Sequence, residues 1–339
     1  MSELQSELVA SSDGTNVIQL SKPFLTSKEI AYLKKTNIGN SDEIRAYSLK
    51  KRETFEFLIR LVKRLHFPVR ILQYCSYLYQ RFFLFSTNFT RDLKWHMEIG
   101  LTALFISMKM NDFIKKLTFV LQESNTARSL HLSPQELESQ RRTIMGLEKT
   151  MMECESFDFR NYCMEDLLVK FTKFFKLSEM ESYISWSILN DLYLTELPLE
   201  LPAHHNAIIA MRTALLILSS ISNHSLHEVD LHKINMRPDN DSLILGVHQM
   251  LEHYIDNYPT TFLKDAMLEI HIDDEPKELV DKFLTVKIDF AKKFPSPREL
   301  HSSVPNQDLL FQPHDSELGK HGCIRFLYNK KKYLDEVSQ

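Results

Sequence analysis

The stretch LKWHMEIGLTALFISMKMND, residues 93–112, decides the fold of this chain. It contains no proline, and large apolar side chains recur at helical spacing, at Met97, Leu101, Leu104, Phe105 and Met108. A second face carries small side chains, at Gly100, Ala103 and Ser107. A helix with this pattern can be approached closely by neighbours on several sides. The stretch therefore predicts the central helix of a helical bundle, with Lys109 at its end and a polar break at Asn111 and Asp112.

The composition around this stretch favours an all-α protein. Only 7 of the 339 residues are glycine, so the turn-rich segments of sandwiches and doubly wound sheets are scarce. Segments with helical spacing dominate instead. We expect a loop over residues 122–132, then a helix that begins at Ser133 and Pro134. A chain of this length can bury one large core or two of ordinary size.

The helical pattern occurs twice, which indicates duplication of one domain. Ala207, Ala210 and Ala214 have the same spacing as Gly100, Ala103 and Ser107. We therefore predict an N-terminal segment over residues 1–47 and two helical domains over residues 48–160 and 161–260. The segment over residues 261–339 follows them. The first segment carries a short helix opened by a capping box at Thr26 and Glu29, and the last carries an amphipathic helix over residues 275–290.

No pattern of residues predicts catalysis. The sequence has no glycine-rich phosphate loop, no nucleophile elbow and no zinc-protease motif. The four cysteines form no CxxC pair, so neither a disulfide framework nor a metal site is expected. A net charge of −4 argues against direct nucleic-acid binding, and no apolar run reaches the length of a membrane span. We interpret the chain as a non-catalytic partner protein without cofactor or metal.

Several motifs in a fixed order resemble those of the cyclin family. The segments are ALFISMKMND (103–112), LEKTMME (147–153) followed by FDF (157–159), and YLYQRF (77–82). In that family two five-helix cyclin boxes follow each other, each with its third helix at the centre. Lys109 matches the lysine at the end of the third helix, and Glu148 matches the glutamate of the fifth. Spacing alone would make Lys109 a helix-end cation and Glu148 an ordinary exposed residue.

More narrowly, the chain resembles transcriptional cyclins of the K, T and C type, and fungal CTD kinase I beta subunits in particular. SKPFL (21–25), LHFP (65–68) and CESFDF (154–159) carry this likeness. The resemblance implies a regulatory subunit that activates a cyclin-dependent kinase acting on the C-terminal repeat domain of RNA polymerase II. It also implies a third, gamma subunit and a nuclear location, with the cytoplasm as an additional compartment. The implied kinase-binding residues are Lys109, Glu148, Lys51, Arg52, Asp112, Phe113 and Ile114, extended by Phe24 and Leu25.

Two other functions stay open at this level. A general transcription factor of the TFIIB type also has two cyclin-like repeats, but it would carry an N-terminal zinc ribbon and a basic core. A helical adaptor unrelated to cyclins would explain the composition but not the positions of Lys109 and Glu148. The substrate-docking phrase of cell-cycle cyclins, MRAIL, is absent, and KRETF (51–55) stands in its place.

Overall fold

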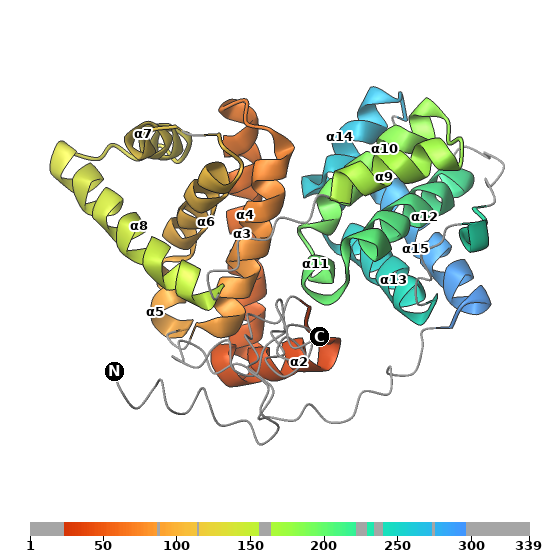
Figure 1. The fold of residues 1–339 in the computed structure, drawn as a ribbon, viewed down its shortest axis with the longest axis horizontal. Helices are drawn as coiled ribbons and strands as arrows, with labels where there is room; N and C mark the ends of the chain where they lie inside the picture. Colours follow the sequence, from red (N-terminus) through yellow and green to blue (C-terminus); the bar gives the residue numbers. More distant parts are fainter. Residues whose placement is uncertain are drawn as a thin grey trace, which may run out of the picture.

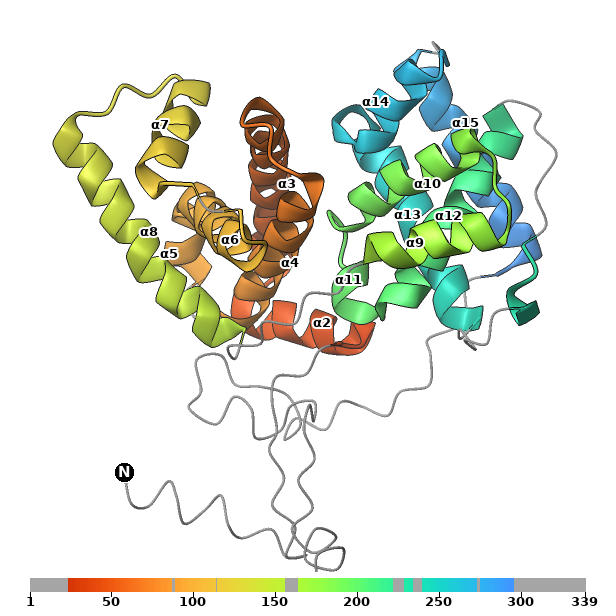
Figure 2. The same ribbon diagram turned by 45° about the horizontal axis from the view of Figure 1, so that its top comes forward.

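The computed structural model describes residues 24–86, 89–113, 115–155, 164–221, 229–233, 240–272 and 275–295. Throughout this part of the chain the regular structure is helical, and it forms two domains side by side (Figures 1 and 2). The first part contains α2 (Ser27–Leu33), the π-helical turn η1 (Lys34–Ile38), α3 (Ser41–Arg64), α4 (Val69–Phe85), α5 (Phe89–Lys94), α6 (His96–Met110), α7 (Leu117–Ala127) and α8 (Pro134–Cys154). The second contains α9 (Met164–Phe174), α10 (Glu179–Leu192), α11 (Leu197–Glu200), α12 (Ala203–Ile221), η2 (Leu231–Lys233), α13 (Asn240–Asn257), η3 (Tyr258–Thr260), α14 (Phe262–Glu269) and α15 (Pro276–Lys293).

Capping boxes open four of these helices. Each has an N-cap side chain that accepts from the N3 backbone N–H, and an N3 glutamate that accepts from the N-cap N–H. The pairs are Thr26–Glu29, Asn40–Glu43, Ser133–Glu136 and Ser178–Glu181. They satisfy backbone donors that a helix start otherwise leaves unpaired. The predicted starts at Thr26 and Ser133 are thereby confirmed.

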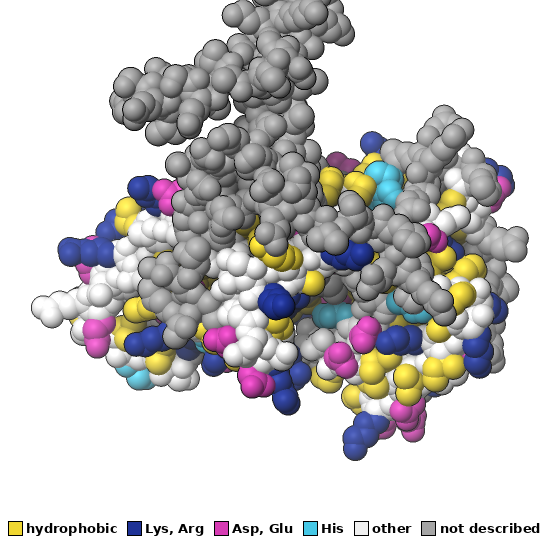
Figure 3. All heavy atoms as spheres, turned by 90° about the horizontal axis from the view of Figure 1, so that it is seen from below, with side chains coloured by type: hydrophobic (Ala, Val, Ile, Leu, Met, Phe, Trp, Pro, Cys, Tyr) yellow, Lys and Arg dark blue, Asp and Glu magenta, His cyan; other side chains and the backbone are white. Residues whose placement is uncertain are grey.

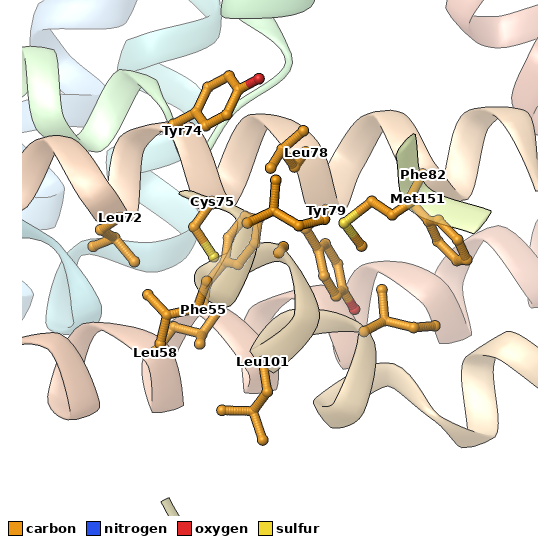
Figure 4. Close-up of a cluster of buried hydrophobic side chains, with 14 of the residues drawn as sticks. Phe55, Leu58, Leu72, Tyr74, Cys75, Leu78, Tyr79, Phe82, Leu101 and Met151 are labelled. Carbon is orange, nitrogen blue, oxygen red and sulfur yellow. The ribbon is translucent and has the colours of Figure 1, made fainter. Parts of the chain in front are cut away.

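The predicted central helix is α6. It begins at His96, not at Leu93, because the helical conformation is interrupted at Trp95, between α5 and α6. Its small-residue face packs against α3 and α4. A Cβ on Gly100 would lie 2.5 Å from Cγ2 of Thr54, so glycine permits this close approach. The core at this contact contains Leu58 of α3, Tyr79 and Phe82 of α4, and Met151 of α8 (Figure 4).

The second domain repeats this packing, with α12 against α10 as α6 is against α4. Ala207, Ala210 and Ala214 are fully buried in its core. Its first helix, α9, also ends in the same way as α3. His66 and Lys176 have positive φ angles of 52° and 56°, and the following N–H groups close back onto the helix, Phe67 to Val62 O and Leu177 to Thr172 O. The same cap also ends α6, α7 and α14, at Asp112, Ser129 and His271, so it is a general helix stop in this chain and the duplication stays a prediction.

These caps yield a stability prediction. Lys176 holds a left-handed conformation that a non-glycine residue adopts at a cost of about 1 kcal/mol. Lys176→Gly should therefore stabilise the second domain by roughly 0.5–1 kcal/mol. Lys170→Gly, at an exposed position in the interior of α9, should destabilise it by about 1 kcal/mol. Urea denaturation of both variants measures the difference, and a destabilised Lys176→Gly protein would contradict the assignment of this cap.

The two domains meet through buried polar contacts. The Gln73 side-chain amide of α4 donates to Oδ1 of Asn190 at 2.7 Å and to Oε1 of Glu165 at 2.9 Å. That of Gln80 donates to the Tyr193 carbonyl at 3.1 Å. Tyr74, a buried member of the first core, projects from α4 on the side of the second domain (Figure 4). Because buried polar groups stabilise mainly when paired, these contacts specify how the domains sit together.

Three predicted boundaries differ from the structure. The first domain was expected from residue 48, but α3 begins at Ser41 because its N-cap lies at Asn40. The expected loop over 122–132 contains the second half of α7, which runs to Ala127. The second core extends beyond residue 260, since Leu263 of α14 and Phe283 of α15 are fully buried in it. The amphipathic helix predicted at 275–290 is α15, and the chain beyond Pro295 lies outside the described residues.

Candidate functional site: a charged pair on α6 and α8

Lys109 and Glu148 lie beside each other on the surface. Lys109 stands in the last turn of α6, and its Nζ is 2.6 Å from Oε1 of Glu148 on α8. Packing of α6 on α8 brings them together, with Ile144 and Met151 buried one turn to either side of Glu148. The Lys109 ammonium also lies 4.3 Å from the centroid of the Phe105 ring.

This pair is accessible and contributes little to folding. The side chains are 46 % and 25 % exposed, and an ion pair of this kind is worth about 0–1 kcal/mol. Sequence reasoning did not identify Met145, which is 49 % exposed and precedes Glu148 by three residues on the same face of α8. The i, i+3 spacing of Met145 from Glu148 was the sequence feature that could have identified it. The surface here places a cation and a carboxylate beside apolar area, so it can offer charged hydrogen bonds and apolar contact to another molecule.

Asp112 and Phe113 follow the pair at the end of α6. Asp112 has a φ of 55°, and the Phe113 N–H donates to the Met108 carbonyl at 2.9 Å. Phe113 is half-buried and packs edge-on against Phe67 with ring centroids 5.1 Å apart. Asp112 therefore belongs to the helix cap, and part of Phe113 belongs to the core. Ile114 lies outside the described residues.

Leu25 requires a correction. It was expected on the kinase-binding surface, but only 2 % of it is exposed, and its N–H donates to the Leu199 carbonyl at 2.8 Å. The segment before α2 is held between the domains, so its apolar side chain packs inside the chain. Phe24 is partly exposed and lines an apolar cavity of about 500 Å³ between α2, α11 and α13.

Glu200 in this cavity makes stability depend on pH. Burial, together with the nearby Glu196 carboxylate, raises the pKa of Glu200 from 4.5 to about 7. Hydrogen bonds from Ser27 and Gln249 lower the pKa of Glu200 but do not outweigh this effect. The folded state therefore holds a proton that the unfolded state releases, and this contribution to stability is lost as pH rises from about 4.5 to about 7.

We expect Glu200→Gln to remove this decline in the free energy of unfolding, which urea denaturation across this pH range measures. Glu196 is the control. Burial alone would raise its pKa, but Lys51 and Lys34 outweigh that effect and lower it, so its contribution is lost as pH falls. Unchanged pH dependence in Glu200→Gln would contradict the raised pKa of this carboxyl.

Lys51 and Arg52 do not lie with Lys109 and Glu148. Nζ of Lys51 is 3.4 Å from Oε1 of Gln80 and 3.9 Å from Oε1 of Glu196, at the junction of the domains. Arg52 pairs with Glu56 one turn along α3, at 3.0 Å. The sequence could not show that Lys51 and Arg52 lie apart from Lys109 and Glu148. Only the packing of α3 against the other helices decides on which side of the domain these side chains lie.

The described residues show no site for metal chemistry or reactive thiols. Within them, no group of three or more His, Cys, Asp or Glu side chains is placed to hold a metal ion. Burial raises the pKa of the Cys75 and Cys154 thiols, which disfavours their reactive thiolate form. A search of the described helices for length and apolar character finds no membrane-spanning candidate. On the described face in Figure 3, basic and acidic side chains are interspersed.

Comparison with known proteins finds related sequences and related structures. No family profile matches the chain. It is 29 % identical over 205 residues to the CTD kinase subunit beta of Schizosaccharomyces pombe, covering 58 % of each chain. It is 27 % identical over 223 residues to that of Saccharomyces cerevisiae, covering 63 % of this chain and 67 % of the relative. The match thus spans less than two thirds of the fission yeast relative's length.

The fold is that of a chain in the crystal structure of the yeast RNA Pol II CTD kinase CTDK-1 complex. The TM-score is 0.66 with 24 % sequence identity, over 80 % of this chain and 84 % of that chain. The all-α fold expected from the sequence is therefore confirmed. The resemblance is confirmed as well. This chain has the cyclin fold, and its sequence is similar to the fungal CTD kinase beta subunits.

Proposed function

We propose that this chain is the regulatory cyclin subunit of a kinase that phosphorylates the C-terminal repeat domain of RNA polymerase II. The observation that carries the proposal is the similarity to two CTD kinase beta subunits, joined to the fold shared with a chain of a CTD kinase complex. The chain itself performs no phosphoryl transfer in this proposal. It needs no cofactor, and catalysis belongs to the partner kinase.

Activation follows from differential binding. A kinase is active when its β3 lysine pairs with the glutamate of helix C. A rigid surface that binds this arrangement more tightly than the inactive one shifts the population toward it. The proposed surface is the end of α6 with the middle of α8. Its helices are fixed by a packed core, so binding energy is not spent on ordering them.

Lys109 and Glu148 suit the centre of such a surface. Their mutual pair is exposed, so opening it costs about 1 kcal/mol or less. Each can then hydrogen-bond kinase groups as the interface excludes water, where charged hydrogen bonds are stronger. The half-exposed Met145 and the partly buried Phe105 supply apolar contact beside them.

The proposal also assigns further partners and a location. A third, gamma subunit would complete the complex. Its candidate contact is the outer face of α15, where Leu284 and Ile288 are 45 % and 48 % exposed one turn apart. Co-purification with and without Leu284→Ser and Ile288→Ser tests that contact. Because RNA polymerase II transcribes in the nucleus, the proposed activity requires a nuclear location. Fluorescence microscopy of the tagged chain checks this location.

Reconstitution tests the function. The full chain is purified with candidate cyclin-dependent kinases of its source organism, and phosphorylation of a polymerase repeat peptide is measured. We expect one kinase to co-elute with the chain and to phosphorylate the peptide only in its presence. Kinase activity independent of the chain would overturn the proposal. Salt-sensitive duplex-DNA binding without any kinase association would favour the TFIIB-like alternative instead.

A further inference from the structure

The cavity of about 500 Å³ described above lies where α2 meets α11 and α13 of the second domain. α2 lies beside α11 in both views of the fold (Figures 1 and 2). Pockets that hold small molecules have volumes of about 300–1,000 Å³ and mainly apolar walls with a few convergent polar groups. The apolar part of this wall consists of Phe24, Leu25, Ala31, Leu197, Leu201 and Leu245. The cavity therefore suits a small occupant with a compact apolar body.

Polar groups from the three helices converge on one carboxyl in this wall. Glu200, the last residue of α11, accepts a hydrogen bond at Oε2 from Oγ of Ser27 on α2, at 3.2 Å. Its carboxylate accepts another from the side-chain amide of Gln249 on α13. Both donors also line the cavity. Because an ionised carboxylate has about four acceptor sites, Glu200 can still accept from a donor inside the cavity.

The charges around Glu200 favour a cation in the cavity. Glu200 makes no ion pair with the described part of the chain, and the Glu196 carboxylate acts on it as a like charge. The Lys34 ammonium near both is already paired with Glu196. Lys28 also lines the cavity, but it does not pair with Glu200. Burial and the like charge both disfavour the ionised carboxyl, so an added cation would stabilise it, whereas an anion would be repelled.

We propose that this cavity binds a small primary amine, in its protonated form, that carries a compact apolar body. The ammonium group lies beside the Glu200 carboxylate and donates to it. The apolar body fills the space lined by Phe24, Leu197 and Leu245. An ammonium has three donors, so it can also donate to the side-chain oxygen of Gln249. A neutral ligand of the same shape would make the apolar contacts but would not compensate the charge of the carboxylate.

Isothermal titration calorimetry of the full-length chain with adamantylmethylamine tests the proposal. This probe joins one ammonium group to a rigid apolar cage. Adamantylmethanol and adamantylacetate are its neutral and anionic counterparts. We expect the amine to bind at least about tenfold more tightly than the alcohol, because a charged hydrogen bond in a partly buried site is stronger than a neutral one. The carboxylate should bind most weakly of the three. Equal affinity of amine and alcohol would overturn the proposal.

Three substitutions locate the binding. Glu200→Gln keeps the size of the side chain and removes its charge, so amine and alcohol should then bind with about equal affinity. Glu278→Gln, at an exposed position on α15, makes the same change of charge elsewhere and should keep the preference for the amine. Leu245→Trp places a larger side chain in the wall and should weaken both probes about tenfold or more. Equal effects of Glu200→Gln and Glu278→Gln would overturn the site.

The pH dependence of binding is a second readout. Because the pKa of Glu200 is raised to about 7, a proton must leave this carboxyl before it pairs with the amine at lower pH. The affinity for the amine should therefore rise as pH increases through about 7, and that for the alcohol should not. Glu196 has a lowered pKa and stays ionised, the cations facing the site are Lys28 and Lys34, and α13 contributes only neutral residues to the wall. An amine affinity independent of pH would contradict pairing with Glu200.

Amine binding and kinase activation are tested separately. The residues that line the cavity include neither Lys109 nor Glu148, and calorimetry needs only the chain itself. Phosphorylation of the repeat peptide by the reconstituted kinase measures activation without any amine present. A chain that activates the kinase but shows no preference for the amine would overturn the cavity site alone. A chain that prefers the amine but activates no kinase would overturn the proposed function alone.

Discussion

Arg81→Ala is expected to lower the free energy of unfolding by about 3–5 kcal/mol, because it leaves a buried carboxylate without its cation. Arg81 of α4 and Glu155 at the C-terminus of α8 are 1 % and 3 % exposed, with Nε 3.2 Å from Oε2. The guanidinium also lies 4.8 Å from the centroid of the Phe85 ring. Urea denaturation of the purified chain measures the loss.

Two further variants test whether the loss of stability comes from the buried ion pair between Arg81 and Glu155. Arg52→Ala breaks an exposed pair on α3 and should cost about 0.5 kcal/mol or less. The double variant Arg81→Met, Glu155→Leu replaces the ion pair with apolar groups and should recover most of the loss. If Arg81→Ala costs no more than Arg52→Ala, the pair does not hold α4 to the end of α8.

The second large effect concerns activation, not stability. In the reconstituted kinase, Lys109→Ala with Glu148→Ala should reduce activation roughly 30-fold or more, because truncating a desolvated charged contact costs about 2–5 kcal/mol of binding. The same double variant should change the free energy of unfolding by about 1 kcal/mol at most, since the pair is exposed. Kinase titrations at fixed peptide concentration measure activation, and urea denaturation measures stability.

The matched control lies on the same helix. Glu138 and Arg142 form an exposed i, i+4 pair on α8, with 3.2 Å between Nε and Oε1. Its double alanine variant removes the same charges and should activate as the unsubstituted chain does. Full activation by the Lys109 and Glu148 variant would remove these residues from the proposed kinase surface. Equal loss in both variants would instead indicate a general effect of charge on α8.

The sequence was informative where local chemistry controls the structure. A capping box needs only residues three apart, and an apolar stripe needs only one helix, so Thr26–Glu29, Ser133–Glu136 and the α6 face were predictable. It was less reliable at Trp95 and over residues 122–127, where tertiary packing overrides weak local preference. Similarity of motif order placed Lys109 at the end of helix three and Glu148 within helix five, but could not show that they pair.

By itself, then, the sequence determined the all-α class, and it predicted the duplicated helical units and the surface on which the functional proposal rests. Only the tertiary structure decided which distant residues meet. It buried Leu25 against Leu199, joined Arg81 to Glu155, and placed Lys51 in a groove opposite His253. The reason is physical: helical periodicity is a property of neighbouring residues, whereas the partners of a side chain depend on how two domains pack, and many contacts distributed along the chain set that packing together.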